Sequence, residues 1–224
     1  MNRHVIIPTT DASKAENLKE YFVEAGWDVH FVENAANIFD AHRKGLEDAG
    51  VLANDKVILC HDDIEILSAP KVFNTLIDNH LDDSQTGFIG VAGSAYVNHQ
   101  INWFQCSKQN DSGGGIVFHG DSVLRMAPSF YGHRENVVVL DGLFLATTGK
   151  VLYGINMNKP KSFVSSWHHY DFSYCIQAHS KRLKNKTVPI SILHRSPGSY
   201  NQSYFDDIPN VASVFDRYLP AVVN

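Results

Sequence analysis

Residues 56–66 read KVILCHDDIEI, and the interpretation of the whole chain starts from them. A short apolar run rich in β-branched residues is typical of a buried strand, and the acids that follow it stand where the strand should meet solvent. The carboxyl ends of strands in an open α/β sheet form a ligand crevice, where carboxylates suit a hard divalent cation. Asp63 and Glu65 are two apart and point to one side of an extended chain, whereas Asp62 points to the other. The stretch is therefore either a metal site or a solvated acidic loop.

The composition is that of an ordinary globular chain of 224 residues, 44% hydrophobic and 19% charged. A chain of this length buries roughly 70% of its unfolded surface, so we expect one domain over residues 1–224. The formal net charge of −5, without a basic stripe, argues against nucleic acid as a partner. No apolar run approaches the roughly 18 residues of a spanning helix, and residues 1–11 lack a signal-peptide core. We expect a cytoplasmic protein that could be peripheral to the inner face of a membrane.

The cysteines predict neither a disulfide framework nor a thiolate metal site. Cys60, Cys106 and Cys175 are odd in number, widely spaced and free of a C-x-x-C pattern. We expect them to be small buried hydrophobes.

The first 60 residues alternate between strand and helix patterns. The elements expected, in order, are 4–7, 13–25, 27–32, 38–46 and 57–60. This is the doubly wound parallel pattern, which brings Thr9, Glu33 and Asp62 to the same edge of the sheet. The chain has no G-x-G-x-x-G and no Walker sequence, which argues against a dinucleotide fold and a P-loop.

These motifs resemble the nucleotide-sugar half of a GT-A glycosyltransferase, and more narrowly the small family-2-like enzymes whose aspartate motif reads His-x-Asp. The matching motifs are Ile6-Ile7-Pro8-Thr9 on the first strand, an acid after the second and His61-Asp62-Asp63 after a later one. The resemblance extends from about residue 4 to residue 198 and depends on the order and spacing of short motifs. It implies an α/β fold with a doubly wound, Rossmann-like, mixed and mainly parallel sheet flanked by helices.

The resemblance also implies the roles of residues on the donor side. The nucleotide-sugar would be held by Pro8, Thr9, Asp11, Glu33 and Asp62, and a divalent ion, Mn²⁺ or Mg²⁺, by Asp63, His194 and Glu65. One departure from the family pattern matters here: Asp62 and Asp63 are adjacent, whereas the usual pair is separated by one residue. If Glu65 turns toward the core instead, the ion keeps only one strong carboxylate and could bind weakly or not at all.

Two further carboxylates stand in apolar or aromatic surroundings. Asp141 interrupts the apolar run 137–146, as an Asp-Gly turn between strands or, by the resemblance, as an acceptor-side residue. Asp171 lies in the first turn of a helix expected over 171–178, where an N-cap role and a general-base role are compatible. His169 could hold that carboxylate or contact the diphosphate. The pair His168-His169 alone is a weak zinc signal because no third ligand is close in sequence.

The rest of the chain is expected to contain a helix over 71–80 and strands over 87–94, 116–118, 137–140 and 188–193. Residues 112–115 read as a hairpin tip or a mobile loop. Residues 181–186 read as the basic end of a helix. The tail beyond residue 195 could cover the donor pocket or mediate self-association, so a homodimer remains open.

The function expected from the sequence is transfer of a sugar from a nucleoside-diphosphate sugar, most simply a UDP-sugar, to a hydroxyl of a glycan or a lipid-linked saccharide. The transfer would be inverting and metal-dependent, with Asp171 as base and Asp141 orienting the acceptor. The single domain would divide into a nucleotide-sugar-binding half (1–95), an acceptor half (96–198) and a tail (199–224). The alternatives are a nucleotide-sugar-binding protein without activity and a metal-dependent hydrolase or nucleotidyltransferase on a related α/β sheet.

Overall fold

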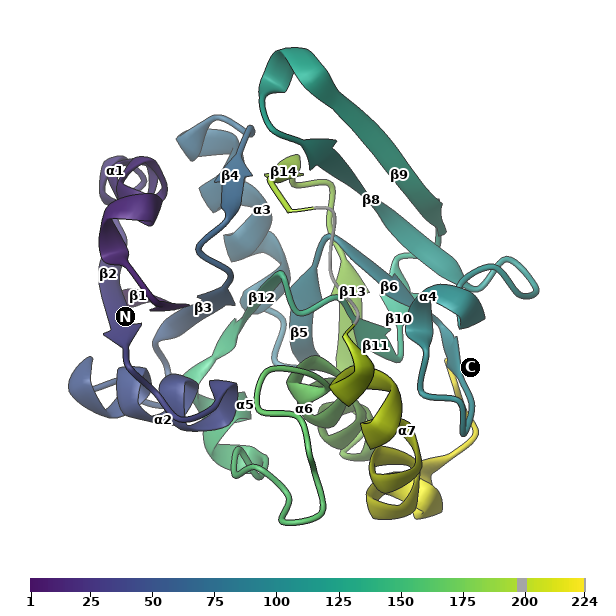
Figure 1. The fold of residues 1–224 in the computed structure, drawn as a ribbon. Coiled ribbons are helices and arrows are strands. Elements are labelled where there is room, and N and C mark those ends of the chain that lie inside the picture. Colours follow the sequence, from purple (N-terminus) through teal and green to yellow (C-terminus); the bar gives the residue numbers. More distant parts are fainter. Residues whose placement is uncertain (197–200, 224) are drawn as a thin grey trace.

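The computed structural model describes residues 1–196 and 201–223, and two mixed sheets flanked by helices make up most of it (Figure 1). The strands of the seven-stranded sheet, from one edge to the other, are β10 (Asn136–Val137), β13 (Lys184–Thr187), β5 (Thr86–Gly90), β12 (Phe144–Thr148), β3 (Lys56–Cys60), β1 (Arg3–Thr9) and β2 (Asp28–Glu33). β1 pairs in parallel with β2 and β3, and β5 in parallel with β13, while β12 runs antiparallel to its neighbours. The mixed, mainly parallel α/β prediction is confirmed.

The second sheet has six strands. They are β11 (Val139–Leu140), β6 (Ala92–Ser94), β8 (Gly113–Gly120), β14 (Ile192–His194) and β4 (Ile64–Ile66), with β9 (Met126–His133) paired to β8. The β8–β9 hairpin extends away from the rest of the molecule in Figure 1. A small pair, β7 (Tyr96–Val97) and β15 (Ala221–Val222), ties the C-terminal segment to the body.

Helices cover both faces of the large sheet. The α-helices of the described chain are α1 (Glu16–Glu24), α2 (Ile38–Asp48), α3 (Pro70–Leu81), α4 (Trp103–Cys106), α5 (Gly149–Gly154), α6 (Tyr170–Ser180) and α7 (Gln202–Phe215), of which α4 packs against β6 and β7 instead. The connection from β1 to β2 and the one from β2 to β3 run in opposite directions across the sheet, so right-handed crossovers place α1 and α2 on opposite faces. α1 packs beside α3 through Phe22 and Phe73, with ring centroids 5.9 Å apart. α2 packs beside α6 through Phe39 and Tyr174, at 5.7 Å.

The stretch expected as one strand over 87–94 is divided between the two sheets. β5 ends at Gly90, and β6 begins at Ala92 in the second sheet. β6 lies against the chain at Val139 so closely that a Cβ on Gly93 would be 2.3 Å from the Val139 carbonyl oxygen. Residues 136–140 divide in the same way, into β10 and β11.

Three other expectations are corrected by the structure. Residues 113–115 begin β8 and form no hairpin tip, and residues 184–187 form β13 in the large sheet and no helix end. The strand expected over 188–193 is the shorter β14 (Ile192–His194), which ends at His194 as expected. β13 forms because the fully buried Asn185 bonds three segments: its amide donates to the carbonyls of Val138 and Cys175 and accepts from the Phe88 N–H.

All three cysteines are free and buried, as expected. No helix among residues 1–196 and 201–223 has both the length and the apolar character needed to cross a membrane. The boundary expected between residues 198 and 199 lies outside the described residues.

Candidate active site

The carboxyl ends of β1, β2 and β3 bring the expected donor-side residues together. Thr9 Oγ1 donates to Asp62 Oδ2 at 2.5 Å and accepts from the Asp11 N–H. Glu33 Oε1 accepts from the N–H of Ala12 at 3.1 Å, so the end of β2 is tied to the turn after β1. Asp11 caps the short helix Ala12–Ala15 through Ser13, and hydrogen bonds from the Ser13 hydroxyl and N–H lower the pKa of Asp11. Pro8 is buried within β1 beside this group.

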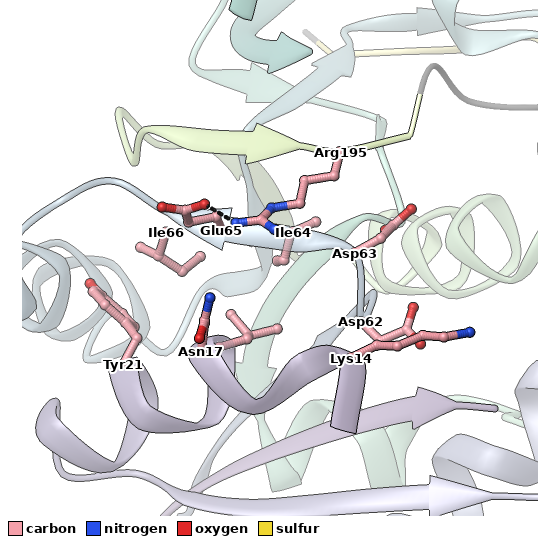
Figure 2. Close-up of a pocket in the computed structure, with 10 residues that line it drawn as sticks. Lys14, Asn17, Tyr21, Asp62, Asp63, Ile64, Glu65, Ile66 and Arg195 are labelled. Carbon is pink, nitrogen blue, oxygen red and sulfur yellow. Dashed lines mark hydrogen bonds and ion pairs between the residues drawn. The ribbon is translucent and has the colours of Figure 1, made fainter. Parts of the chain in front are cut away.

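A pocket of about 360 Å³ opens beside this edge, between α1 and the segment 62–66. Figure 2 shows the side chains of α1 along one side of the pocket and residues 62–66 along the other. Lys14 and Arg195 are the cations that line it, and Asp62 and Asp63 are among its acids. We call it the smaller pocket.

His61, Asp63 and His194 form a cluster suited to a metal ion, with one candidate ligand atom from each residue within 4.8 Å of the others. His61 follows β3, and its N–H donates to Leu143 beside it. His194 ends β14, where it lies opposite Ile64 of β4. Asp63 Oδ1 is 3.3 Å from His194 Nε2 and 3.7 Å from His61 Nδ1.

The protonation states in this cluster differ between the two histidines. Desolvation lowers the pKa of His61, which favours the neutral ring that can bind a metal. Desolvation works against the charged form of His194, but the nearby Asp63 carboxylate outweighs it and raises the pKa of His194. Desolvation likewise works to raise the pKa of Asp63, but its contacts with His194 and His61 lower it. In the absence of a cation, His194 and Asp63 therefore act as an ion pair.

Glu65, the third metal ligand expected from the sequence, has a different partner. It bonds Arg195 at 2.5 Å, as the dashed line in Figure 2 marks, and it is not a member of the His61–Asp63–His194 cluster. Register explains this: Glu65 sits in β4 opposite Leu193, while Asp63 precedes β4 in the turn from His61. The structure favours His61 over Glu65 as the third ligand.

A larger pocket, of about 730 Å³, lies on the other side of the cluster. His61 and His194 line it, together with Asp141 and Asp171. Its walls carry the aromatic side chains of Trp103, Phe104, Phe130, Tyr131, Trp167 and Tyr204. The cluster thus stands between the two pockets, with Asp63 on the smaller one and the histidines on the larger one.

Asp141 and Asp171 both accept hydrogen bonds from the backbone of the turn at Gly142 and Leu143. Asp141 follows β11 and accepts from the Leu143 N–H at 3.1 Å, which makes residues 141–143 a tight turn. Asp171, in the first turn of α6, accepts from the Gly142 N–H at 3.2 Å and from the Phe172 N–H at 2.8 Å. Both of the expected roles of Asp141, turn and pocket residue, are therefore compatible with the geometry.

The pKa of Asp171 is raised to about 7, first by desolvation and then by the neighbouring Asp141 carboxylate. The hydrogen bonds from Phe172 and Gly142 work in the opposite direction without cancelling the shift. A pKa near 7 is what a general base needs in order to accept a proton at neutral pH.

His169 anchors the C-terminal helix. Its Nε2 donates to the Tyr204 carbonyl at 2.9 Å, and its ring stacks on that of Tyr204 with centroids 4.4 Å apart. Desolvation lowers the pKa of His169, so the ring is neutral at pH 7. This geometry gives His169 structural contacts at the wall of the larger pocket, and its expected contact with Asp171 or with the diphosphate stays a prediction.

Three residues at the site had no role assigned from the sequence. His61 could have been found from its spacing, because His61 and Asp63 alternate along an extended chain and point the same way. His119 lies beside His194 in β8, with ring centroids 5.6 Å apart, and no local pattern in the sequence marks it. Tyr170 bonds His61 across 109 positions of sequence, a distance that no motif spans.

Comparisons with known proteins identify the family and support the fold. The model of a family described as a glycosyltransferase-like family matches residues 15–194. The search of curated proteins finds no match.

Among solved structures, GalNAc-T7 with UDP, GalNAc and Mn²⁺ aligns at a TM-score of 0.58 with 14% identity, over 97% of this chain and 49% of that one. This chain therefore spans about half the length of GalNAc-T7, and the likeness supports the GT-A-like fold alone. A197 from STIV aligns at 0.49 with 10% identity, over 88% of this chain and 86% of that one.

The family match covers most of the 224 residues, including the whole stretch from α1 to His194. Fold and family agree with what the motifs at the ends of β1, β2 and β3 predict. The chain belongs to the glycosyltransferase-like family and is a glycosyltransferase.

Proposed function

We propose that the protein transfers a sugar from a nucleoside-diphosphate sugar to a hydroxyl of a glycan, with a divalent ion bound by His61, Asp63 and His194. The observation that carries this proposal is the position of that cluster between the two pockets. A donor diphosphate at the cluster would have Asp62 and Asp63 on one side, and on the other Asp171, whose pKa of about 7 suits a base.

The cluster fits a metal ion by the chemistry of its donor atoms. Asp63 Oδ1 is buried, and its nearest polar neighbours are His194 Nε2 at 3.3 Å and His61 Nδ1 at 3.7 Å, so a cation held among the three would satisfy it. Two imidazoles and one carboxylate favour Mn²⁺ over Mg²⁺, because Mg²⁺ prefers ligand sets made of oxygen. Once bound, the ion would offset the charge that develops on the leaving diphosphate.

The chain's own residues supply the other half of the reaction. Asp171, in its carboxylate form, takes the proton from the acceptor hydroxyl as that oxygen forms a bond to the anomeric carbon. The bond between that carbon and the diphosphate breaks, and its electron pair leaves with the diphosphate. Attack from the side of Asp171, opposite the leaving group, inverts the anomeric centre. Asp141 would orient the acceptor beside Asp171.

The donor side is proposed from the residues gathered at the ends of β1, β2 and β3. Thr9 and Asp62 form a hydrogen-bonded pair that can meet ribose or sugar hydroxyls, with Glu33, Asp11 and Pro8 beside it. Uridine is the nucleoside that we propose, because the similar GalNAc-T7 structure contains UDP, GalNAc and Mn²⁺. The division into a donor half (1–95) and an acceptor half (96–198) follows from the same assignment.

The acceptor is proposed to be a saccharide because the larger pocket presents aromatic faces. Trp167 and Phe130 line it and are 48% and 60% exposed, so their rings are free to contact a ligand. Exposed aromatic rings bury apolar area at low cost in conformational entropy and suit the apolar faces of sugar rings. A glycan and a lipid-linked saccharide share this chemistry. A cytoplasmic location and a homodimer stay predictions.

The experiment is a release assay with a panel of UDP-, GDP-, CMP- and dTDP-sugars and Mn²⁺, with and without a mixture of oligosaccharides. We expect one donor class to release its nucleotide faster when acceptor is present, with a new anomeric configuration in the product. Sugar released at the same rate without acceptor would favour the hydrolase alternative. No release with any donor would favour the binding-protein alternative.

A further inference from the structure

We propose that Tyr170 is the positioning residue of the metal site: its hydroxyl fixes the tautomer of His61 so that Nδ1, with a free lone pair, faces Asp63. The inference rests on the proposed metal-dependent function and identifies which hydrogen bond prepares the site for the ion. It follows from assigning the donor and acceptor roles around the buried Tyr170 hydroxyl.

The Tyr170 hydroxyl has two partners. It lies 2.8 Å from the carbonyl oxygen of Gly142 and 2.9 Å from Nε2 of His61. A carbonyl oxygen only accepts, so the single hydroxyl proton goes to Gly142. The hydroxyl oxygen must then accept from His61, whose proton is on Nε2.

A neutral imidazole carries one proton, so a proton on Nε2 leaves Nδ1 as an acceptor. Nδ1 is the His61 atom 3.7 Å from Asp63 Oδ1, a buried carboxylate oxygen that likewise only accepts. Two acceptors that face each other repel unless a cation lies between them. The tautomer set by Tyr170 thus produces a pair of ligand atoms, one from each residue.

The hydroxyl is in turn held in place by the fold. Tyr170 is 4% exposed and lies in the first turn of α6. Residue Gly142 is held at both of its backbone groups, since its carbonyl accepts from Tyr170 and its N–H donates to Asp171. A Cβ on Gly142 would be 2.4 Å from the Tyr170 oxygen, so the close approach needs glycine there. The backbone of one residue, Gly142, therefore helps to position both the ligand His61, through Tyr170, and the base Asp171.

α6 also provides a matched control. Tyr174 lies one turn further along the helix, is fully buried, and has its hydroxyl 3.3 Å from His42 Nδ1. Tyr174→Phe removes a buried hydroxyl from the same helix without touching His61. Tyr170→Phe keeps the ring and removes only the hydroxyl.

The test is Mn²⁺ binding to the metal-free protein by calorimetry, for wild type, Tyr170→Phe and Tyr174→Phe. Groups that orient a metal ligand typically change the affinity roughly 10- to 100-fold, and we expect Tyr170→Phe to weaken Mn²⁺ binding by about that factor. Tyr174→Phe should bind as wild type does. In a His61→Ala background, Tyr170→Phe should cause no further loss, because the effect passes through His61.

A second measurement does not depend on a variant that must fold. Nitrogen NMR of the metal-free wild type, with the His61 signals assigned by their loss in His61→Gln, should show the proton on Nε2. A proton on Nδ1 would overturn the inference, as would unchanged Mn²⁺ affinity in Tyr170→Phe or an equal loss in Tyr174→Phe. If the wild type binds no Mn²⁺ at all, the proposed metal-dependent function is contradicted instead.

Discussion

At the scale of the residue, the proposed proton transfer depends on one carboxylate, Asp171. Its desolvated position next to Asp141 raises its pKa to about 7, so kcat/KM should rise with pH up to about 7 and then level off. Asp171→Asn keeps the shape and removes the basic oxygen, and we expect its kcat to fall by about 10²- to 10⁴-fold. A release assay with saturating donor and acceptor measures this. Activity within a few-fold of wild type would assign the base to another group.

The same pKa predicts how stability changes with pH. The folded state holds the Asp171 proton up to about pH 7, whereas the unfolded chain releases it near its ordinary value of 3.8. Between these values the native state binds more protons, so this group's contribution to stability decreases as pH rises. Asp171→Asn has no carboxyl group at this position, so its stability does not decrease with pH for this reason. The difference in unfolding free energy should therefore shift in favour of the variant between about pH 4 and pH 7 and then level off, as measured by urea unfolding; a difference that does not change with pH would contradict the raised pKa.

At the scale of the element, α7 holds the wall of the larger pocket through Asp207. This fully buried carboxylate accepts from the N–H groups of Val164 and Ser165, each at 2.6 Å, in the segment that leads to Trp167. Asp207→Asn replaces one acceptor oxygen with a donor and leaves an N–H without its partner. We expect a loss of about 1–3 kcal/mol in unfolding free energy by denaturant titration.

The adjacent Asp206 is a matched control, because it is exposed and its hydrogen bond, accepted from the Gln202 side chain, lies at the surface. Asp206→Asn should change stability by less than about 0.5 kcal/mol. Equal effects of the two substitutions would mean that the cap on residues 164 and 165 is not what fixes this segment.

Elements with a strong period were predictable, and those set by distant contacts were not. The helix expected over 71–80 became α3 (Pro70–Leu81), because one apolar face repeats along it. Residues 184–187 read as a basic helix end, since lysines dominate them, yet Asn185 makes them a strand through bonds to three other segments. The division of residues 87–94 between two sheets has the same cause, a close contact with the distant chain at Val139.

At the scale of the whole molecule, the family and the edge of the sheet that carries the site follow from the order of the motifs. The ends of β1, β2 and β3 meet because parallel strands with right-handed crossovers bring their carboxyl ends together. The larger pocket was not predictable in the same way, because its aromatic walls come from α4, the β8–β9 hairpin and the segment before α6. Only the folded chain brings these parts next to Asp171.

The most direct test of the account is the unfolding midpoint of the protein with UDP, with Mn²⁺, and with both, for wild type, Asp63→Ala and Glu65→Ala. A ligand at 100 times its Kd adds about 2.7 kcal/mol, which raises the midpoint of a chain of this size by roughly 5–10 °C. We expect this increase in wild type and in Glu65→Ala when UDP and Mn²⁺ are both present, and its loss in Asp63→Ala. An increase that persists in Asp63→Ala, or a wild type unaffected by UDP and Mn²⁺ together, would contradict a donor site built on His61, Asp63 and His194.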